Sequence, residues 1–418
     1  MKRRRLYWYL AGLAGALGLA ASCSATGRGS AFDNDESEED GSSDTTNGTG
    51  GAGGGDGSST LSLSSGVGGG GGSGFCTSVP DQDGDNDGFT PNDGDCNDCD
   101  PNVNPGAIEV IVDTPPEGEM EVPEPADENC DNQIDNVDVA TCDDNIALSD
   151  FDPLNGARAL DICQQATVND KKWGVLQAAY VRANGQPAGP STQLGILSSF
   201  GPNVNVQRGM RMLGLSSGRA RSASDPNACG NNSCTGYGGG VAPAGFPQDS
   251  PQCMGGDNIN DDVGLELTLR APTNAIGYSF NFTFYSFEYP EWVCTTFNDQ
   301  FIALVDPPPM GSINGNISFD SNSNPVSVNI AFFQVCSGCA LGTAELVGTG
   351  FDSWDDAGAT SWLKTSAPIT GGEEFKIRWT IWDTGDTAWD STALIDNFQW
   401  VASGGTVTIG TEPVPDPL

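Results

Sequence analysis

Alternating apolar and polar residues mark the second half of the chain. Residues 276–284 carry Ile, Tyr or Phe at every second position, and residues 375–381 carry Phe, Ile or Trp in the same way. A period of two is typical of β-strands with one buried face. Weaker runs of this kind occur at 174–182, 193–200, 263–270, 326–333 and 393–401. The pattern predicts a mainly β domain over residues 145–403, a jelly-roll-like β-sandwich.

One helix is expected at the start of this domain. Asp152 is a suitable N-cap and Pro153 suits the first helical position. Leu160, Cys163 and Ala166 follow at helical spacing, so the helix is expected to include them.

The N-terminal residues predict export. Residues 1–22 combine a basic run at 2–5 with an apolar run at 6–21, as signal peptides do. Residues 19–23, with the sequence LAASC, resemble the lipobox of bacterial lipoproteins, in which the cysteine is lipidated. We therefore expect a lipid on Cys23 that anchors the protein in the outer membrane or at the cell surface. An ordinary cleaved signal and an uncleaved anchor helix are the alternatives.

Two further segments lack the pattern of a folded core. Residues 23–75 consist largely of Gly, Ser and Thr, and they are expected to form a disordered tether because they have too few apolar side chains to bury. Residues 404–418 are rich in proline and are expected to form a tail.

Residues 76–144, the acidic module, form a separate block. They contain 21 acids, no Lys or Arg, and few large apolar residues, so they need disulfides, metal or both to fold. The whole chain has 13 cysteines, and if Cys23 is lipidated, 12 remain for disulfides in an oxidising compartment. The pairing is left open among these candidates: Cys76, Cys96, Cys99, Cys130, Cys142, Cys163, Cys229, Cys234, Cys253, Cys294, Cys336 and Cys339.

The charge of the chain excludes several classes of function. It has 418 residues with 56 Asp and Glu, 17 Lys and Arg, and no histidine, for a net charge of −39. Such a chain repels nucleic acid, so no nucleic-acid partner is expected. Without histidine it cannot form a Ser-His-Asp, Cys-His or HExxH site. Abundant carboxylates suit calcium, whereas the lack of imidazole makes copper doubtful.

The clearest candidate metal site is a loop of alternating aspartates. Asp83, Asp85 and Asp87 alternate, and Gly88 stands at the sixth position, where a calcium loop turns sharply. Such a loop would also use the backbone carbonyl of Phe89. Position twelve lacks the usual Glu, and the nearest substitutes are Asp93 and Asp95. A solvated acidic turn without an ion is the alternative.

Two resemblances to known families extend this picture. Residues 83–89, 94–101, 104–109 and 128–136 resemble the MopE-type metal-binding repeat of bacterial surface proteins, interrupted by an insertion at 110–127. This resemblance implies metal binding and adds Asp98 and Asp100 to the candidate ligands. The segments 150–154, 193–201, 260–265, 284–294 and 383–391 resemble the choice-of-anchor L domain of bacterial surface proteins. That resemblance implies an exported, surface-attached module without enzymatic activity.

Several residues of the β domain leave alternatives open. A possible second ion site, or a set of turn caps, comprises Glu288, Glu291, Asp299, Asp383, Asp386 and Asp390. A glycoside hydrolase that uses Glu288 or Glu291 is a further alternative. Five tryptophans form either a sugar-stacking platform or part of the core: Trp354, Trp362, Trp382, Trp389 and Trp400.

The function expected from the sequence is that of a lipid-anchored, calcium-binding cell-surface protein. Its β-sandwich would be presented for adhesion to a surface glycan or a protein ligand. A carbohydrate-active enzyme and a structural or metal-sequestering envelope protein are the alternatives.

Overall fold

The structure is a computed structural model, and it describes residues 76–112, 115, 122–136, 142–234, 236–250, 253, 256–330, 332–354, 356–403 and 405–415. The predicted signal peptide, Cys23 and the tether at 23–75 lie outside these residues. Within the described ranges, no helix has the length and apolar character needed to cross a membrane.

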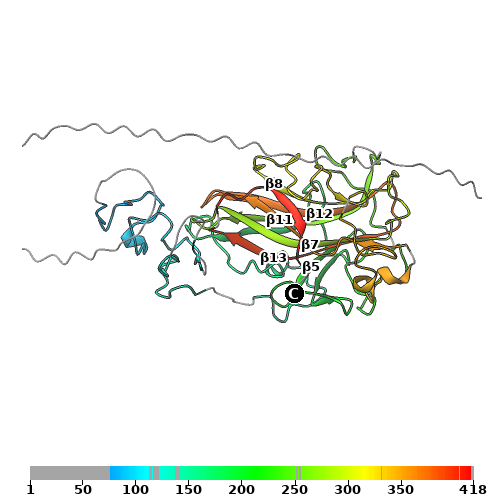
Figure 1. Ribbon diagram of the computed structural model, residues 1–418, viewed down its shortest axis with the longest axis horizontal. Helices are drawn as coiled ribbons and strands as arrows, with labels where there is room; N and C mark the ends of the chain where they lie inside the picture. The colour runs from blue at the N-terminus through cyan, green and yellow to red at the C-terminus, as the bar shows by residue number, and fades with distance from the viewer. Residues whose placement is uncertain are drawn as a thin grey trace, which may run out of the picture. The chain divides into compact units, whose positions relative to one another are not determined.

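Fourteen strands are formed by the described residues (Figure 1). They are β1 (Gly174–Val181), β2 (Leu194–Leu197), β3 (Ser199–Phe200), β4 (Val204–Asn205), β5 (Met212–Ser216), β6 (Ile259–Arg270), β7 (Gly277–Ser286), β8 (Gln300–Asp306), β9 (Val326–Ser327), β10 (Gly358–Ala359), β11 (Leu363–Pro368), β12 (Glu374–Thr384), β13 (Ser391–Val401) and β14 (Gly410–Pro413). The helical elements are η1 (Pro91–Asp93), α1 (Pro153–Arg158), η2 (Ala344–Leu346) and η3 (Phe351–Ser353).

These strands build two antiparallel sheets and a small β3–β4 pair. One sheet has the order β1-β6-β12-β8-β9, and the other has the order β14-β11-β7-β13-β5-β2 with β10 paired to β7. The predicted mainly β fold with antiparallel sheets is therefore confirmed. The runs at 174–182, 263–270 and 393–401 correspond to β1, β6 and β13. The strand β14 lies within the segment expected as a tail and pairs with β11.

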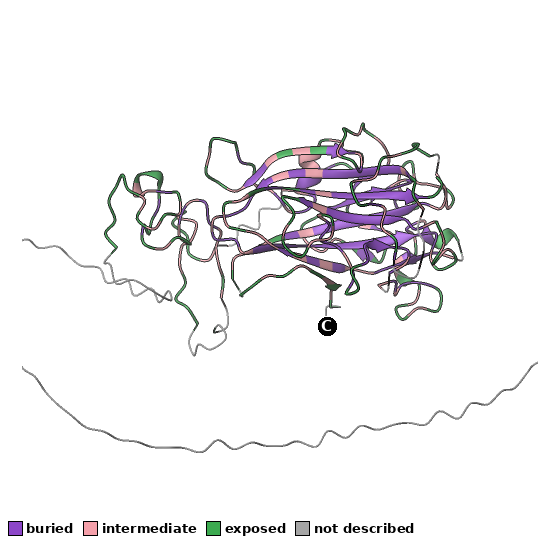
Figure 2. Cartoon of the chain, turned by 90° about the horizontal axis from the view of Figure 1, so that it is seen from above, coloured by how far each residue is buried: buried purple, intermediate pink, exposed green. Residues whose placement is uncertain are grey.

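The core lies between the facing sheets. Tyr278 of β7 stacks on Phe375 of β12 with ring centroids 5.2 Å apart, and Phe280 meets Trp379 edge-on at 5.4 Å. All four side chains are buried because strand alternation sends them to the inner face. Figure 2 shows that burial follows the strands of both sheets, while the connecting loops carry most of the exposed residues. The period-two pattern of the sequence thus becomes the sandwich core.

Both sheets contribute to one loop-bearing end of the sandwich. In the larger sheet, Ser286 at the end of β7 pairs with Ser391 at the start of β13. In the other sheet, Trp382 near the end of β12 pairs with Gln300 at the start of β8. The segments that follow β7 and β12 therefore lie beside those that precede β13 and β8. This end, called here the loop end, contains the buried acids described below.

The helix is shorter than its sequence pattern predicts. The Asp152 carboxylate accepts a hydrogen bond from Leu154 N–H at 3.0 Å, so the predicted N-cap is confirmed. The expected inclusion of Leu160, Cys163 and Ala166 is wrong, because α1 ends at Arg158. Asp161 adopts a left-handed backbone, and Ala166 N–H donates instead to the Val175 carbonyl of β1. Tertiary pairing with β1 outweighs the helical spacing here.

Disulfides connect the twelve cysteines in six pairs. The pairs are Cys76–Cys99, Cys96–Cys130, Cys142–Cys163, Cys229–Cys234, Cys253–Cys294 and Cys336–Cys339. Two of them lie within the acidic module, whose described residues form no strand and only the short η1. The expectation that disulfides join this block is therefore confirmed.

Replacement of a core leucine tests the sandwich. Leu267 of β6 is fully buried, so Leu267→Ala is expected to lower the free energy of unfolding by about 2–5 kcal/mol. Leu341 is 42% exposed, and Leu341→Ala is expected to cost less than about 1 kcal/mol. Chemical denaturation of both variants measures the difference, and equal losses would contradict the assigned core.

Candidate metal sites

The first candidate site is the acidic loop, residues 81–98. One carboxylate oxygen from each of Asp83, Asp85 and Asp87 lies within 4.8 Å of the others. Asp83 accepts hydrogen bonds from the backbone N–H groups of Asn86 and Gly88 at 2.7 and 3.0 Å. These bonds fold the loop tightly, and the alternation in the sequence then brings the three carboxylates together.

Four carboxylates of the acidic loop share one arrangement. In Asp85, Asp87, Asp95 and Asp98, one oxygen accepts a backbone N–H at 2.7 to 3.2 Å. The second oxygen of each is buried and has no hydrogen-bond partner among the described residues. Buried polar atoms normally have a partner, so these four carboxylate oxygens are suited to coordinate a cation.

The electrostatics of the acidic loop agree with this arrangement. Burial raises the pKa of Asp85 above its ordinary value, and repulsion from Asp87 raises it further. The pKa values of Asp87 and Asp95 are also raised, again mainly by burial and then by neighbouring aspartates. A bound divalent cation would remove this repulsion. The donor set consists of oxygens alone and therefore fits calcium.

The other ligands predicted for this site lie in different surroundings. Asp93 caps η1 and accepts a hydrogen bond from Lys171 at 3.0 Å, which holds its pKa below the ordinary value. Asp100 accepts hydrogen bonds from the backbone and side chain of Asn102. The Phe89 ring is buried, and Lys171 Nζ lies 5.1 Å from its centroid. The structure thus groups Asp83, Asp85 and Asp87, while Asp95 and Asp98 lie close enough to raise the pKa values of Asp87 and Asp85, respectively.

A further acidic cluster was not singled out as a site from the sequence. Glu109, Glu128 and Asp135 place carboxylate oxygens within 4.8 Å of one another. Both oxygens of Glu109 accept backbone N–H groups, from Asn129 at 3.2 Å and from Asp135 at 2.9 Å. In the sequence, these three acids were marked only by lying in the segments that resemble the metal-binding repeat. Because the Glu109 oxygens have protein partners, this cluster has less need of a cation.

The second candidate site is the buried triad, formed by Glu288, Asp299 and Asp383. Oxygens of the three carboxylates lie within 4.8 Å of one another, and no side chain is more than 1% exposed. Glu288 follows β7, Asp299 immediately precedes β8, and Asp383 lies near the end of β12. The register of the two sheets therefore brings these residues together at the loop end.

Hydrogen bonds satisfy only part of the buried triad. Asp299 accepts from Thr384 N–H at 2.9 Å and from Ser391 Oγ at 2.6 Å. Neither oxygen of Asp383 has a hydrogen-bond partner among the described residues. Burial raises the pKa of Asp299 to about 8 and raises that of Glu288 well above its ordinary value. Burial and repulsion from both neighbours also raise the pKa of Asp383.

The remaining acids of the predicted second ion site lie outside the triad. Glu291 and Asp386 are exposed, and Asp386 accepts a hydrogen bond from Ala388 N–H at 2.9 Å. Asp390 is buried, accepts from Cys234 N–H at 2.8 Å, and has a pKa raised to about 7 by burial. The sequence predicted six acids for this site, and the structure groups three of them.

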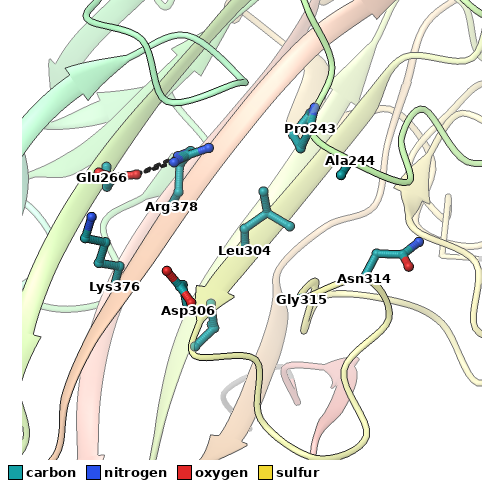
Figure 3. A pocket seen from close by; sticks show the side chains of 10 residues that line it. Pro243, Ala244, Glu266, Leu304, Asp306, Asn314, Gly315, Lys376 and Arg378 are labelled. Carbon is teal, nitrogen blue, oxygen red and sulfur yellow. Dashed lines mark hydrogen bonds and ion pairs between the residues drawn. The ribbon is translucent and has the colours of Figure 1, made fainter.

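Two cavities lie away from the acidic loop and the buried triad. A pocket of about 270 Å³ lies over β6, β8 and β12, and Figure 3 shows Arg378 paired with Glu266 beside Lys376 and Asp306. Its charges lie close to groups of opposite sign, so it offers no orphaned carboxylate comparable to Asp383. A cavity of about 810 Å³ is lined by residues of the acidic module and of the sandwich. Neither cavity is lined by the acidic loop or by the buried triad.

The five tryptophans named as a platform separate in the structure. Trp382 is fully buried, Trp362 packs against a core cluster, and Trp400 packs on Tyr278 and on neighbouring rings. Trp354 is 45% exposed and meets Trp389 edge-on at 5.6 Å.

Trp389 also meets Trp292, again at 5.6 Å, although the sequence did not suggest Trp292 for this role. We call Trp292, Trp354 and Trp389 the tryptophan cluster. Trp292 and Trp389 lie on the segments of the loop end.

Substitution of Asp85 tests the acidic loop. Asp85→Asn keeps an oxygen for the backbone bond but removes a charge from the set of orphaned oxygens, so calcium affinity of this site is expected to fall about tenfold or more. Calorimetric titration of the full chain measures this change. Asp144→Asn, an exposed change in the same module, is the control. Equal calcium binding by both variants would argue against an ion in the acidic loop.

Comparison with known proteins adds a family to this geometry. A family model, the choice-of-anchor L domain, matches residues 159–398, which is more than half of the chain. No curated protein matches the chain. The match includes β1 to β12, most of β13 and the whole buried triad, and together with the disulfides it indicates an extracellular or cell-surface β-sandwich protein. The chain belongs to the choice-of-anchor L domain family.

Proposed function

We propose that this cell-surface protein is a lipid-anchored, calcium-dependent adhesin whose sandwich presents its loop end to a ligand. The observation that carries the proposal is the set of orphaned carboxylate oxygens in the acidic loop. Calcium would order that loop, and the ordered module would support the sandwich on its membrane tether.

Direct contacts couple the acidic module to the sandwich. The Cys142–Cys163 disulfide joins the two covalently. Asn274 donates to the Ile108 carbonyl at 2.8 Å and accepts from Ile108 N–H at 3.1 Å. Thr273 N–H donates to the Gly106 carbonyl at 3.0 Å. If an ion orders the acidic module, these contacts would therefore also restrain the part of the sandwich that they reach.

The tryptophan cluster supports the ligand-binding part of the proposal. Its rings contact one another edge-on, and Trp354 keeps 45% of its surface exposed. An exposed indole ring can stack on the apolar face of a sugar ring. Tryptophan is enriched at binding interfaces because it combines a large apolar ring with a polar N–H group. A surface glycan is therefore the favoured ligand class.

The catalytic alternative has less support. A glycoside hydrolase needs two carboxylates that reach opposite sides of a bound glycosidic bond. Glu288 is 1% exposed and borders neither cavity described above, whereas Glu291 is exposed. The family is a surface-anchoring family that is not known for enzymes. Hydrolysis of a glycan that is lost in Glu291→Gln would revive this alternative.

Loss of the exposed indole tests adhesion. Trp354→Ala is expected to weaken glycan binding about tenfold or more, because it removes the most accessible ring of the cluster. Met310→Ala is the control, since Met310 is 95% exposed and follows the opposite end of β8. Binding on a glycan array, followed by titration of the strongest glycan, measures the effect. A chain that binds no glycan, or binds equally in both variants, would refute the proposed ligand class.

A change at Cys23 tests the lipid anchor. Cys23→Ser is expected to abolish incorporation of labelled fatty acid and to move the protein from the membrane fraction to the soluble fraction, because the acyl chains provide the attachment. Ser24→Ala leaves the cysteine in place and should remain in the membrane fraction. If Cys23→Ser also sediments with membranes, the attachment has another origin.

A further inference from the structure

We propose that the buried triad is a calcium site that clamps the two sheets of the sandwich together at the loop end. This site is separate from the acidic loop of the proposed function, and it can exist whether or not the loop end binds a glycan.

The position of Asp299 allows it to act on both sheets. One of its oxygens accepts from Thr384 N–H of β12, and the other accepts from Ser391 Oγ of β13. Its backbone N–H faces Glu288 Oε2 at 3.4 Å, which brings in the segment after β7. An ion held by the triad would therefore be attached to both sheets through a single carboxylate and its neighbours.

Asp383 provides the observation that calls for a ligand. Its side chain is fully buried, and both of its oxygens lack a partner among the described residues. Two other buried acids of the sandwich have close partners: Asp262 pairs with Arg182 at 2.6 Å, and Asp396 accepts from Gln207 N–H at 2.6 Å. A buried polar atom without a partner destabilises the fold, and a charged one does so more strongly. Among the described acids, Asp383 differs from the others in that both of its oxygens are buried and unpartnered, and a cation would give both a partner.

Among the described residues, no basic side chain forms an ion pair with the buried triad. The charged groups that act on Glu288 and Asp383 are acids, including Asp261 and Asp386. The ion pairs of the described ranges involve other carboxylates. Three carboxylates this close repel one another strongly, and only protons or an external cation can compensate.

Protons compensate the triad less completely than a cation does. If Asp383 donates a shared proton to Asp299, its second oxygen still lacks a donor, and Glu288 needs a proton of its own. A divalent cation contacts all three carboxylates at once.

The donor chemistry selects calcium among common ions. The three ligands are carboxylates, which provide up to six oxygens in a site closed to solvent. Zinc prefers nitrogen and sulfur ligands, but the chain has no histidine and the nearby Cys294 is oxidised in a disulfide. Magnesium retains several waters, which a closed site excludes, whereas calcium accepts an irregular shell of protein oxygens.

The test compares matched Asp-to-Asn variants of the full chain. Asp383→Asn removes a ligand without removing any hydrogen bond found among the described residues, so the metal-free variant should fold. Asp306→Asn, at the exposed opposite end of β8, is the control. Elemental analysis after equilibration in calcium is expected to show one ion fewer per chain for Asp383→Asn only. Calcium should also raise the Tm of this variant by about 5 °C less than that of the control.

A second measurement does not depend on any variant. In the wild-type chain, hydrogen exchange of residues 286–299 is expected to slow in calcium relative to chelator, and magnesium should have a smaller effect. Unchanged exchange, or equal calcium content in Asp383→Asn and Asp306→Asn, overturns the proposal and leaves the triad as protonated acids. Loss of an ion in Asp383→Asn but not in Asp85→Asn would instead refute the acidic-loop site and leave the triad site standing.

Discussion

Carboxylates that are buried close together repel one another unless a proton, a basic side chain or a metal ion lies among them. This constraint acts twice in the present chain, in an irregular disulfide-linked loop and inside a β-sandwich. In both places, three carboxylates place oxygens within 4.8 Å of one another, and at least one of them has a buried oxygen without a protein partner among the described residues. With 17 basic residues for 56 acidic ones, the chain cannot neutralise all of its acids internally. We therefore expect its stability to depend on the ions around it.

The two sites differ in what they would stabilise. The acidic loop belongs to a block whose described residues form no strand and are joined by two disulfides, so an ion there would supply order that the block does not obtain from a core. The buried triad lies in a sandwich that already has an extensive aromatic core. An ion there would secure the loop end, whose segments carry Trp292 and Trp389. Ions at both sites would thus stabilise the acidic module and the loop end, which is the surface that we propose for ligand contact.

Much of the architecture could be predicted from local sequence. The alternation at 276–284 and 375–381 predicts β7 and β12, because a strand presents successive side chains to opposite faces. The spacing of Asp83, Asp85 and Asp87 predicts a shared site, because neighbouring residues of one loop remain close in space. The length of the helix was the weakest local prediction. The residues after Arg158 leave the helix, and Ala166 forms a backbone hydrogen bond with β1 instead.

The sequence by itself determined the local elements of this protein and the side chains available to it. These are strands with one apolar face, an acidic loop, twelve cysteines available for pairing, and no imidazole. Only the tertiary structure decided which distant residues meet. It selected Glu288, Asp299 and Asp383 from six acidic candidates, and it separated the buried Trp382 from the exposed Trp354. The physical reason is that strand register and sheet packing set contacts across about a hundred residues of chain, and no local pattern encodes them.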